Sequence, residues 1–293
     1  MAINSIKMII PCQCLLGEGP YYSASLKCLF WVDILDKLLY RFDCQQQTVC
    51  RYPMEQAICW IMETTEQRLI AGFERGIYYL DNNTFQPSEL YPLATLAVNN
   101  RLNDAKTDRN GHVFFGTMDK HEQHNTGALY RFGQQQTPTI VDSNYVISNG
   151  PAISKNGRIL YSTESSTRTI YQFDLNEQGE LSNKRVFVKF DETMGFPDGM
   201  TVDNDNHLWV ASWNGHGLYR FCENGSIVHF YRLPAPRITS LTFFGDDLTT
   251  IAVTSARTGL EPEILKQYPY SGAVFILQAD IQGIAETPAQ LCS

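Results

Sequence analysis

The chain has 293 residues, of which 43% are hydrophobic, 12% aromatic and only 18% charged. This charged fraction lies below the roughly 25% usual in soluble domains, which excludes a disordered or coiled-coil chain. The formal net charge is −8 and the basic residues are scattered, so nucleic acid is not an expected partner. The many aromatic, glycine and proline residues favour short strands and turns, and the expected class is all-β.

The start of the chain and its cysteines carry no targeting or disulfide signal. The apolar start after Lys7 stops at Pro11, too short for a signal-peptide core, and no stretch reaches the roughly 18 apolar residues of a membrane span. The eight cysteines are irregularly spaced, and we interpret them as reduced thiols, with Cys12 and Cys14 alternating along an extended segment. We therefore expect a cytoplasmic protein with no membrane partner.

A pair of strands recurs six times along the chain. In each pair an apolar strand is followed, after a loop, by a second strand rich in aromatic residues. The pairs are 29–33 with 39–42, 69–73 with 77–80, 113–117 with 129–132, 159–163 with 170–173, 208–212 with 218–221, and 251–255 with 274–276. Six copies in 293 residues correspond to a period of about 49 residues.

Each copy contains further strands. A short strand precedes the pair, and the turn between them is Asn-Gly at 110–111 and again at 156–157, the strongest short hairpin signal. A fourth strand follows in several copies, for instance at 185–190. Four antiparallel strands with a period in the forties are typical of a propeller blade. The sequence predicts a six-bladed β-propeller around a central channel, a single domain over 1–293, with residues 6–10 closing the ring beside the last blade.

Polar side chains recur at one position of the repeat. Counting back 11 to 13 residues from the buried aromatic of the second strand reaches Glu18, Asn103, Asn149 and Asp198, whereas the other two blades place Ile58 and Ser240 there. Because the first strand of each blade lines the channel, we expect the four polar side chains to converge. Two carboxylates and two amides would repel or go unsatisfied without a cation. Oxygen donors favour Ca²⁺, Mg²⁺ or Mn²⁺, although carboxylates also bind Zn²⁺ and Fe²⁺.

These residues lie in motifs that resemble the gluconolactonase, regucalcin (senescence marker protein) and luciferin-regenerating enzyme family. The motifs occupy 16–20, 100–104, 115–118, 147–150, 197–200, 208–212, 239–241 and 254–257, in that order. The resemblance implies a six-bladed propeller with one catalytic divalent metal near the axis, and the hydrolysis of sugar lactones. It also implies that Glu18, Asn149 and Asp198 are the metal ligands.

The resemblance further implies that Arg101 and Asn103 contact the substrate, with Asn103 at or near the coordination sphere of the metal. One position departs from the family pattern. Mammalian regucalcin-like members place an acidic, sugar-contacting residue shortly after the motif at 116–118, whereas this sequence continues with 119–122, Asp-Lys-His-Glu. His121 is the candidate substrate-binding residue there, and the sugar preference is not carried over.

The expected reaction is the opening of a sugar lactone, such as gluconolactone, to the sugar acid. A metal with few protein ligands keeps positions for water and for the lactone carbonyl, and Asp198 is the candidate catalytic residue, acting as ligand and general base. The chain has no Gly-x-Ser-x-Gly elbow, which argues against a serine esterase. We expect a monomer or a weak homo-oligomer.

Two alternatives use the same ring of donors. A regucalcin-like calcium-binding regulatory protein would bind the metal without catalysis, but it would need neither Arg101 nor vacant coordination positions. A metal-dependent esterase or phosphotriesterase would need an apolar channel mouth, for which Ile58, Trp60 and Trp213 are the candidate wall residues. An apolar mouth would favour this second alternative over a sugar lactonase.

Overall fold

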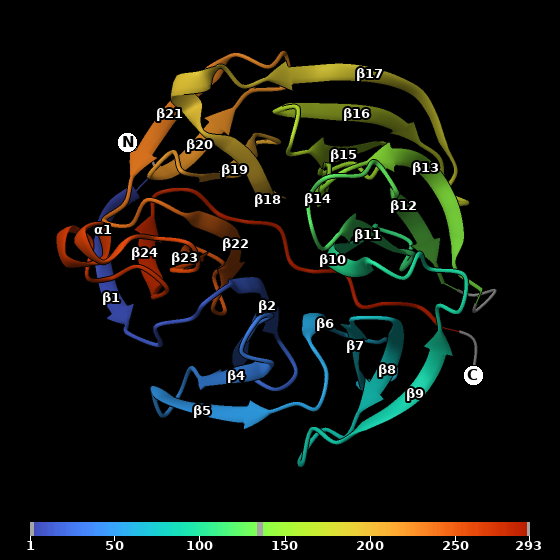
Figure 1. The fold of residues 1–293 in the computed structure, drawn as a ribbon, viewed down its shortest axis with the longest axis horizontal. Helices are drawn as coiled ribbons and strands as arrows, with labels where there is room; N and C mark the ends of the chain where they lie inside the picture. Colours follow the sequence, from blue (N-terminus) through green and yellow to red (C-terminus); the bar gives the residue numbers. More distant parts are fainter. Residues whose placement is uncertain (1–2, 134–136, 292–293) are drawn as a thin grey trace.

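The computed structural model describes residues 3–133 and 137–291, in which six four-stranded antiparallel sheets form a ring (Figure 1). The repeat is therefore a propeller blade, as the sequence predicts. The strands of blades 1 to 3 are β2 (Gly17–Ser23), β3 (Cys28–Asp33), β4 (Leu38–Asp43), β5 (Thr48–Pro53), β6 (Ile58–Glu63), β7 (Leu69–Phe73), β8 (Gly76–Leu80), β9 (Pro87–Pro92), β10 (Asn100–Thr107), β11 (Val113–Asp119), β12 (Gly127–Phe132) and β13 (Thr139–Tyr145).

Blades 4 to 6 repeat this order from the axis outwards. Their strands are β14 (Ser148–Ile153), β15 (Ile159–Glu164), β16 (Thr169–Leu175), β17 (Leu181–Lys189), β18 (Phe196–Val202), β19 (Leu208–Trp213), β20 (Gly217–Phe221), β21 (Ile227–Arg232), β22 (Ile238–Phe244), β23 (Thr250–Ser255), β24 (Val274–Ala279) and β1 (Ile3–Ile10). Two short helices that the repeat does not predict interrupt it, η1 (Glu192–Met194) and α1 (Pro262–Gln267).

The first strand of the chain completes the last blade. β1 pairs antiparallel with β24, with Ile6 opposite Leu277 and Ile10 opposite Val274. The predicted ring closure is thus confirmed, and it joins the two ends of the repeat by main-chain hydrogen bonds.

Aromatic side chains fill the space within and between blades. Trp209 stacks on Tyr231 of its own blade, with ring centroids 5.1 Å apart, and meets Phe243 of the next blade edge-on at 6.0 Å. The repeated aromatic of the second strand is almost fully buried in four blades, at Trp31, Phe115, Tyr161 and Trp209. This packing explains why the aromatic position marks the repeat in the sequence.

Blade 2 buries its aromatic differently. Trp60 lies on the inner strand β6, and a Cβ on Gly72 would come within 2.1 Å of the indole ring, so only glycine fits opposite it. Ile58 and Trp60 are at most 1% exposed and belong to the hydrophobic core. They are therefore core residues and not walls of the channel mouth.

The cysteines form no disulfide in the described part of the chain. Seven of them, at positions 12, 14, 28, 44, 50, 59 and 222, are free thiols, and Cys292 lies outside the described residues. This agrees with the prediction of reduced thiols. Cys12 and Cys14 flank Gln13, whose φ of 55° turns the chain between them.

The segment after β24 crosses one end of the channel, as the dark red trace in Figure 1 shows. It bridges to blade 5 at Gly283, opposite Asp203, and to blade 2 at Ala289, opposite Thr64. The amide of Gln290 then donates to the carbonyl oxygen of Gly111 in blade 3 at 2.9 Å. This segment, residues 280–291, closes the channel at the end where the inner strands finish, which is the closed end. The candidate site lies at the opposite, open end, where the inner strands begin.

Candidate active site

All six inner strands carry a register shift at the predicted site position. In the four blades with a polar residue there, the shift lies between Glu18 and Tyr21, between Leu102 and Ala105, between Asn149 and Ala152, and between Pro197 and Met200. The strands β6 and β22 shift beside Ile58 and Ser240. A bulge bends a strand and re-aims its side chains. Glu18 and Asn149 are each the second residue of their strand and Asp198 is the third, so these residues lie near the start of the inner strands, at the open end of the channel.

Glycine follows the site residue in three of the four bulges. Gly19 and Gly150 have φ values of 51° and 61°, a region that side chains with a Cβ rarely adopt. Gly199 is instead required by packing, because a Cβ there would lie 2.2 Å from Ser240 Oγ. In each of the motifs Glu-Gly, Asn-Gly and Asp-Gly, the backbone conformation or the packing therefore requires the glycine. The residue before it supplies the polar side chain of the site.

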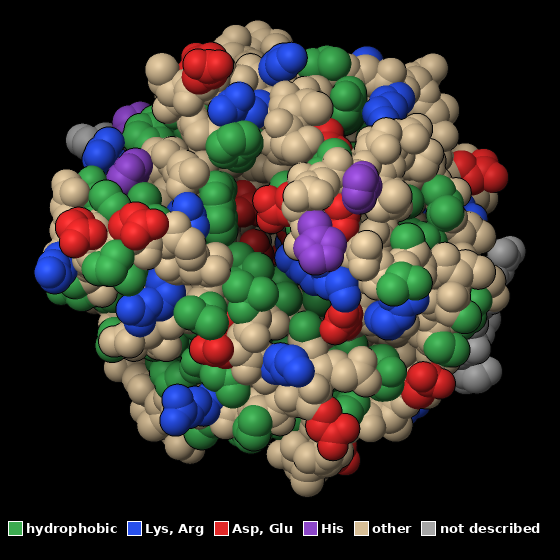
Figure 2. Space-filling view, viewed as in Figure 1, with side chains coloured by type: hydrophobic (Ala, Val, Ile, Leu, Met, Phe, Trp, Pro, Cys, Tyr) green, Lys and Arg blue, Asp and Glu red, His purple; other side chains and the backbone are tan. Residues whose placement is uncertain are grey.

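The four side chains converge at the floor of a cleft of about 630 Å³ at the open end of the channel. Figure 2 shows this hollow at the centre of the face, with acidic side chains inside it and basic and histidine side chains along one part of its rim. Glu18, Asn103, Asn149 and Asp198 all line the cleft and are only 5–6% exposed. They come from blades 1, 3, 4 and 5, as the repeat count predicts.

A chain of hydrogen bonds connects three blades across the floor. Arg101 Nη1 donates to Asn103 Oδ1 at 2.6 Å, and Asn103 Nδ2 donates to Asn149 Oδ1 at 2.7 Å. Asn149 Nδ2 donates to Ser165 Oγ at 3.1 Å, which in turn donates to the carbonyl oxygen of Pro197 at 2.7 Å. Asn103 therefore orients the Asn149 oxygen. Arg101 and Asn103 lie together beside the cleft, where the sequence analysis expects substrate contacts.

Three carboxyl groups are buried close to one another. Burial and the neighbouring Asp104 raise the pKa of Glu18 to about 8. Burial, followed by the charges of Glu18 and Asp104, raises the pKa of Asp198 well above its usual range. Burial also raises the pKa of Asp104 to about 6, and the nearby Lys106 opposes that change. Without a cation, these carboxyl groups resist becoming charged together.

The donor set fits a divalent cation. Asp198 Oδ1 is buried and has no hydrogen-bond partner among the residues that the structure describes. A buried carboxylate oxygen without a partner is costly unless a cation or water satisfies it. Glu18 and Asp198 supply negative charge, and Asn149 supplies an oriented amide oxygen beside them. This combination suits a hard metal ion that keeps positions for further oxygen ligands.

Asp104 is a neighbour of the site that the sequence did not single out, and it lines a small void beside Gly19 and not the cleft itself. It follows Asn103 directly, and in a regular strand adjacent side chains point to opposite faces. The register shift between Leu102 and Ala105 removes this alternation, and the charge of Asp104 acts on both Glu18 and Asp198. The signal was present in the Asn-Arg-Leu-Asn-Asp motif at 100–104, but only the bulge shows that its last residue lies beside the site.

We predict that the stability of the metal-free protein falls as the pH rises. The pKa of Glu18 is about 8 in the folded chain against an ordinary value of 4.5, so the folded state binds the proton more tightly. The contribution of Glu18 to the free energy of unfolding is then greatest below pH 4.5 and decreases between pH 4.5 and pH 8, by at most about 1.4 kcal/mol for each pH interval of one. Urea unfolding of metal-stripped protein at pH 5 and pH 8 measures the effect.

The Glu18→Gln variant isolates the contribution of this carboxyl. Its unfolding free energy should decrease less over the same pH range, and saturating divalent metal should remove most of the decrease in the wild-type protein. Parallel pH dependences of variant and wild type would show that Glu18 is not the source.

His121 lies on an exposed loop and is not among the residues that line the cleft. Its neighbours Lys120 and Glu122 do line it, and Lys120 Nζ forms an ion pair with Glu74 Oε1 of blade 2 at 2.8 Å. Asp119 holds the loop by accepting hydrogen bonds from the amides of residues 121, 123 and 124. The substrate-binding role of His121 stays a prediction, and Lys120 and Glu122 are better placed for such a role.

Part of the cleft wall is apolar. Trp213, one of the three candidate wall residues from the sequence, lines the cleft. Arg237 stacks over its ring, with the guanidinium carbon 4.6 Å from the ring centroid. Leu16, Ile34, Leu35, Met118, Ile147 and Phe196 also line the cleft. The floor is thus polar, whereas the wall contains apolar side chains from blades 1, 3, 4 and 5.

A second acidic cluster lies at the closed end and is held by an arginine. Asp203, Asp205 and His207 bring their ligand atoms within 4.8 Å of one another. Arg220 donates through Nε to Asp203 Oδ2 at 2.8 Å, and its Nη2 lies 3.3 Å from Asp205 Oδ2 and 3.0 Å from His207 Nδ1. A guanidinium therefore occupies the position that a cation would take, and the cluster stabilises the β18–β19 turn.

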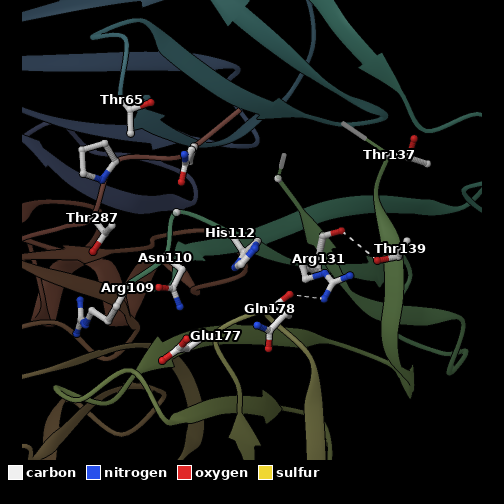
Figure 3. A pocket seen from close by; sticks show the side chains of 14 residues that line it. Thr65, Arg109, Asn110, His112, Arg131, Thr137, Thr139, Glu177, Gln178 and Thr287 are labelled. Carbon is white, nitrogen blue, oxygen red and sulfur yellow. Dashed lines mark hydrogen bonds between the residues drawn. The ribbon is translucent and has the colours of Figure 1, made fainter. Parts of the chain in front are cut away.

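The closed end also has a hollow of about 750 Å³ (Figure 3). Each of its basic residues already has at least one partner. His112 Nδ1 lies 2.9 Å from Asp108 Oδ2, and Arg131 Nη1 donates to the carbonyl oxygen of Gln178 at 2.8 Å. Arg109 Nη2 donates to the carbonyl oxygen of Ile153 at 3.1 Å, whereas its Nε has no partner among the described residues. Figure 3 shows these side chains spread around the hollow without a shared focus. The axial cleft, with its four converging donors, is the stronger candidate site.

Comparisons with known proteins give a family-model match and several similar relatives. Residues 16–257 match the model of the SMP-30/Gluconolactonase/LRE-like region. The chain is 32% identical over 258 residues to the pentonolactonase XacC of Haloferax volcanii, covering 86% of this chain and 85% of that protein. It is 27% identical to the 6-deoxy-6-sulfogluconolactonase of Pseudomonas putida, covering 97% and 98%.

The fold has a solved counterpart. The crystal structure of a calcium-binding protein, regucalcin, from Agrobacterium tumefaciens matches with a TM-score of 0.92 and 22% identity over 97% of both chains. Among the described residues, no helix has the length and hydropathy needed to cross a membrane.

Proposed function

The chain belongs to the SMP-30/gluconolactonase/LRE-like family, and from this premise we propose that it is a metal-dependent hydrolase that opens sugar lactones to sugar acids. Two relatives are named as lactonases, one for pentonolactones and one for a sulfogluconolactone. The observation that carries the proposal is Asp198 Oδ1, a buried carboxylate oxygen without a described partner at the floor of the cleft.

Glu18, Asn149 and Asp198 would hold the metal. When bound, a divalent ion supplies Lewis-acid chemistry, polarising the lactone carbonyl and stabilising negative charge that develops on its oxygen. The cleft above the donors is large enough for a monosaccharide lactone, at about 630 Å³. The hard oxygen donors favour Ca²⁺, Mg²⁺ or Mn²⁺, and Zn²⁺ and Fe²⁺ also accept such ligands.

Asp198 is the proposed general base. The oxygen of its carboxylate that is not used to hold the metal would accept a proton from the water that attacks the lactone carbonyl carbon, and the bond between that carbon and the ring oxygen then breaks. The same carboxyl returns the proton to the ring oxygen as it leaves, so that lactone and water yield one hydroxy acid. The neighbouring backbone amide of Gly199 favours the charged form of the Asp198 carboxyl and so opposes part of the rise in its pKa.

Arg101 and Asn103 are the proposed substrate-orienting residues. The guanidinium of Arg101 is held by Asn103 Oδ1 and by the carbonyl oxygen of Leu102, at 2.6 and 2.8 Å. A planar, multidentate donor can bind two neighbouring hydroxyl or ring oxygens of a lactone in one orientation.

For Arg101→Lys, we predict that KM for the lactone rises about tenfold or more while kcat falls less. Lysine keeps the charge but loses the two-point geometry that holds the substrate in both ground and transition state. Steady-state kinetics at saturating metal measure both constants. Arg131→Lys, at the closed end, is the matched control and should leave both unchanged, and an unaltered KM in Arg101→Lys would contradict the assignment.

A panel of gluconic, galactonic, xylonic and arabinonic lactones tests the activity itself. Each is assayed on metal-stripped protein supplemented with Ca²⁺, Mg²⁺, Mn²⁺, Zn²⁺ or Fe²⁺, with acid release followed by a pH indicator. We expect metal-dependent opening of at least one lactone. Failure of every combination would reject the proposal.

A second candidate, a metal-dependent esterase, is favoured by one observation: Leu35, Phe196 and Trp213 give the cleft an apolar wall. Aryl esters assayed beside the lactones separate the two substrate classes. The calcium-binding alternative agrees with the description of the regucalcin structure from Agrobacterium tumefaciens as a calcium-binding protein. A protein that only binds calcium would need neither a cleft of this size nor Arg101 beside the metal ligands, so we favour the enzyme.

A further inference from the structure

The closed end of the channel contains an ion pair supplied by the C-terminal segment. Glu286 Oε1 lies 2.7 Å from Lys106 Nζ, and Thr242 Oγ1 donates to the same oxygen at 3.2 Å. The Lys106 and Glu286 side chains are only 15% and 11% exposed. Lys106 belongs to β10, the strand that carries Asn103 and Asp104, so the segment 280–291 contacts the inner strand that carries part of the candidate site.

Little space separates this pair from the candidate site. Asp104 and Lys106 are two residues apart on one strand, so their Cα atoms lie about 7 Å apart. Both line a void of about 20 Å³, together with Gly19 of the Glu18 bulge, Ser240 and Glu286. Such a void holds about one water molecule. The carboxyl cluster and the ion pair are thus neighbouring layers of the same channel.

The charges of the pair act on the carboxyl cluster. Lys106 lowers the pKa of Asp104 and Glu286 raises it. Asp104 in turn raises the pKa of both Glu18 and Asp198. A change of charge at position 286 is therefore expected to alter the electrostatic potential at the metal ligands.

We propose that Glu286 is a positioning residue for the metal centre, because its pairing with Lys106 cancels a buried cation that would otherwise repel a divalent ion held by Glu18 and Asp198. This inference rests on the proposed function. An uncompensated positive charge about 10 Å from a divalent ion, at an effective dielectric constant between about 25 and 50, corresponds to a roughly 10- to 100-fold loss of affinity.

The test measures metal binding without substrate. Chelator-stripped wild type and Glu286→Gln are titrated with Ca²⁺ and with Mn²⁺ by isothermal calorimetry, and we expect the variant to bind about 10- to 100-fold more weakly. The double variant Lys106→Met/Glu286→Gln removes both charges and should return the affinity to within about threefold of wild type. Glu286→Asp keeps the charge and should also stay close to wild type.

The matched control is Glu66→Gln, which removes one exposed carboxylate from the β6–β7 turn at the same end of the propeller and should leave the affinity unchanged. Equal affinities of wild type and Glu286→Gln would overturn the inference and leave the proposed function standing. Wild type that binds none of the divalent ions would overturn the proposed function and the inference with it.

The double variant also separates charge from packing. If it binds metal as weakly as Glu286→Gln, the loss comes from disturbed packing of the C-terminal segment and the inference is wrong. If Glu286→Gln does not fold, as judged by circular dichroism, the double variant still decides: an affinity more than about tenfold below wild type overturns the inference.

Discussion

Replacing Asp198 with asparagine is expected to lower kcat for lactone opening by about 1,000-fold, even when the metal site is saturated. Asparagine keeps the shape and one oxygen of the side chain but cannot accept the proton of the attacking water, and positioned bases of this kind contribute about 10²- to 10⁴-fold. The assay is steady-state opening of the best aldonolactone, with metal content measured on the same sample.

The control for this variant is Asp205→Asn, which lies in the same blade at the closed end of the channel, with its side chain 59% exposed. Its turnover should equal that of wild type. If Asp198→Asn retains full turnover with metal bound, Asp198 is not the base. If the variant has lost its metal, activity at a metal concentration that restores occupancy decides between the two roles.

Removing the metal is expected to have the other large effect. A chelator should reduce activity by at least about 100-fold, and added divalent ion should restore it, because the proposed metal is the group that would stabilise negative charge on the lactone carbonyl oxygen. Glu18→Gln should imitate chelation by weakening metal affinity about 100-fold or more, since it removes one of two charged ligands. Activity measured against free metal concentration reports both results.

This prediction separates loss of function from loss of fold. Metal-free Glu18→Gln should be at least as stable as metal-free wild type at pH 8, because the substitution removes a buried carboxyl whose pKa of about 8 shows that it resists ionisation. A variant that is inactive but stable supports a role in metal binding. Full activity of the chelated wild-type protein would reject the metal centre altogether.

Much of the fold could be predicted because the same strand pattern occurs six times, so that strands that are ambiguous in one copy can be identified from the others. The buried aromatic recurs at Trp31, Phe115, Tyr161 and Trp209, and one blade cannot cover its own faces, so six copies must close a ring. Strand pairs, hairpin turns and the closing role of β1 all follow from that reasoning. The two short helices lie in loops outside the repeat, where no periodic pattern predicts them.

The candidate site could be predicted in outline but not in detail. Counting from the repeated aromatic located Glu18, Asn103, Asn149 and Asp198 correctly at the cleft floor. The count cannot detect the bulge in β10, so Asp104 was missed. It also cannot say how the loop at 119–126 turns, and that loop directs Lys120 and Glu122, not His121, to the cleft.

The sequence by itself determined the number of blades and the polar residue that each of four blades contributes, because both are properties of a repeat and are written at fixed spacing along the chain. Only the tertiary structure decided what surrounds those residues. The C-terminal segment reaches Lys106 from a distance of 180 residues through Glu286, and the apolar wall combines side chains from blades 1, 3, 4 and 5. Such contacts depend on how the ring closes in space, and no local pattern encodes them.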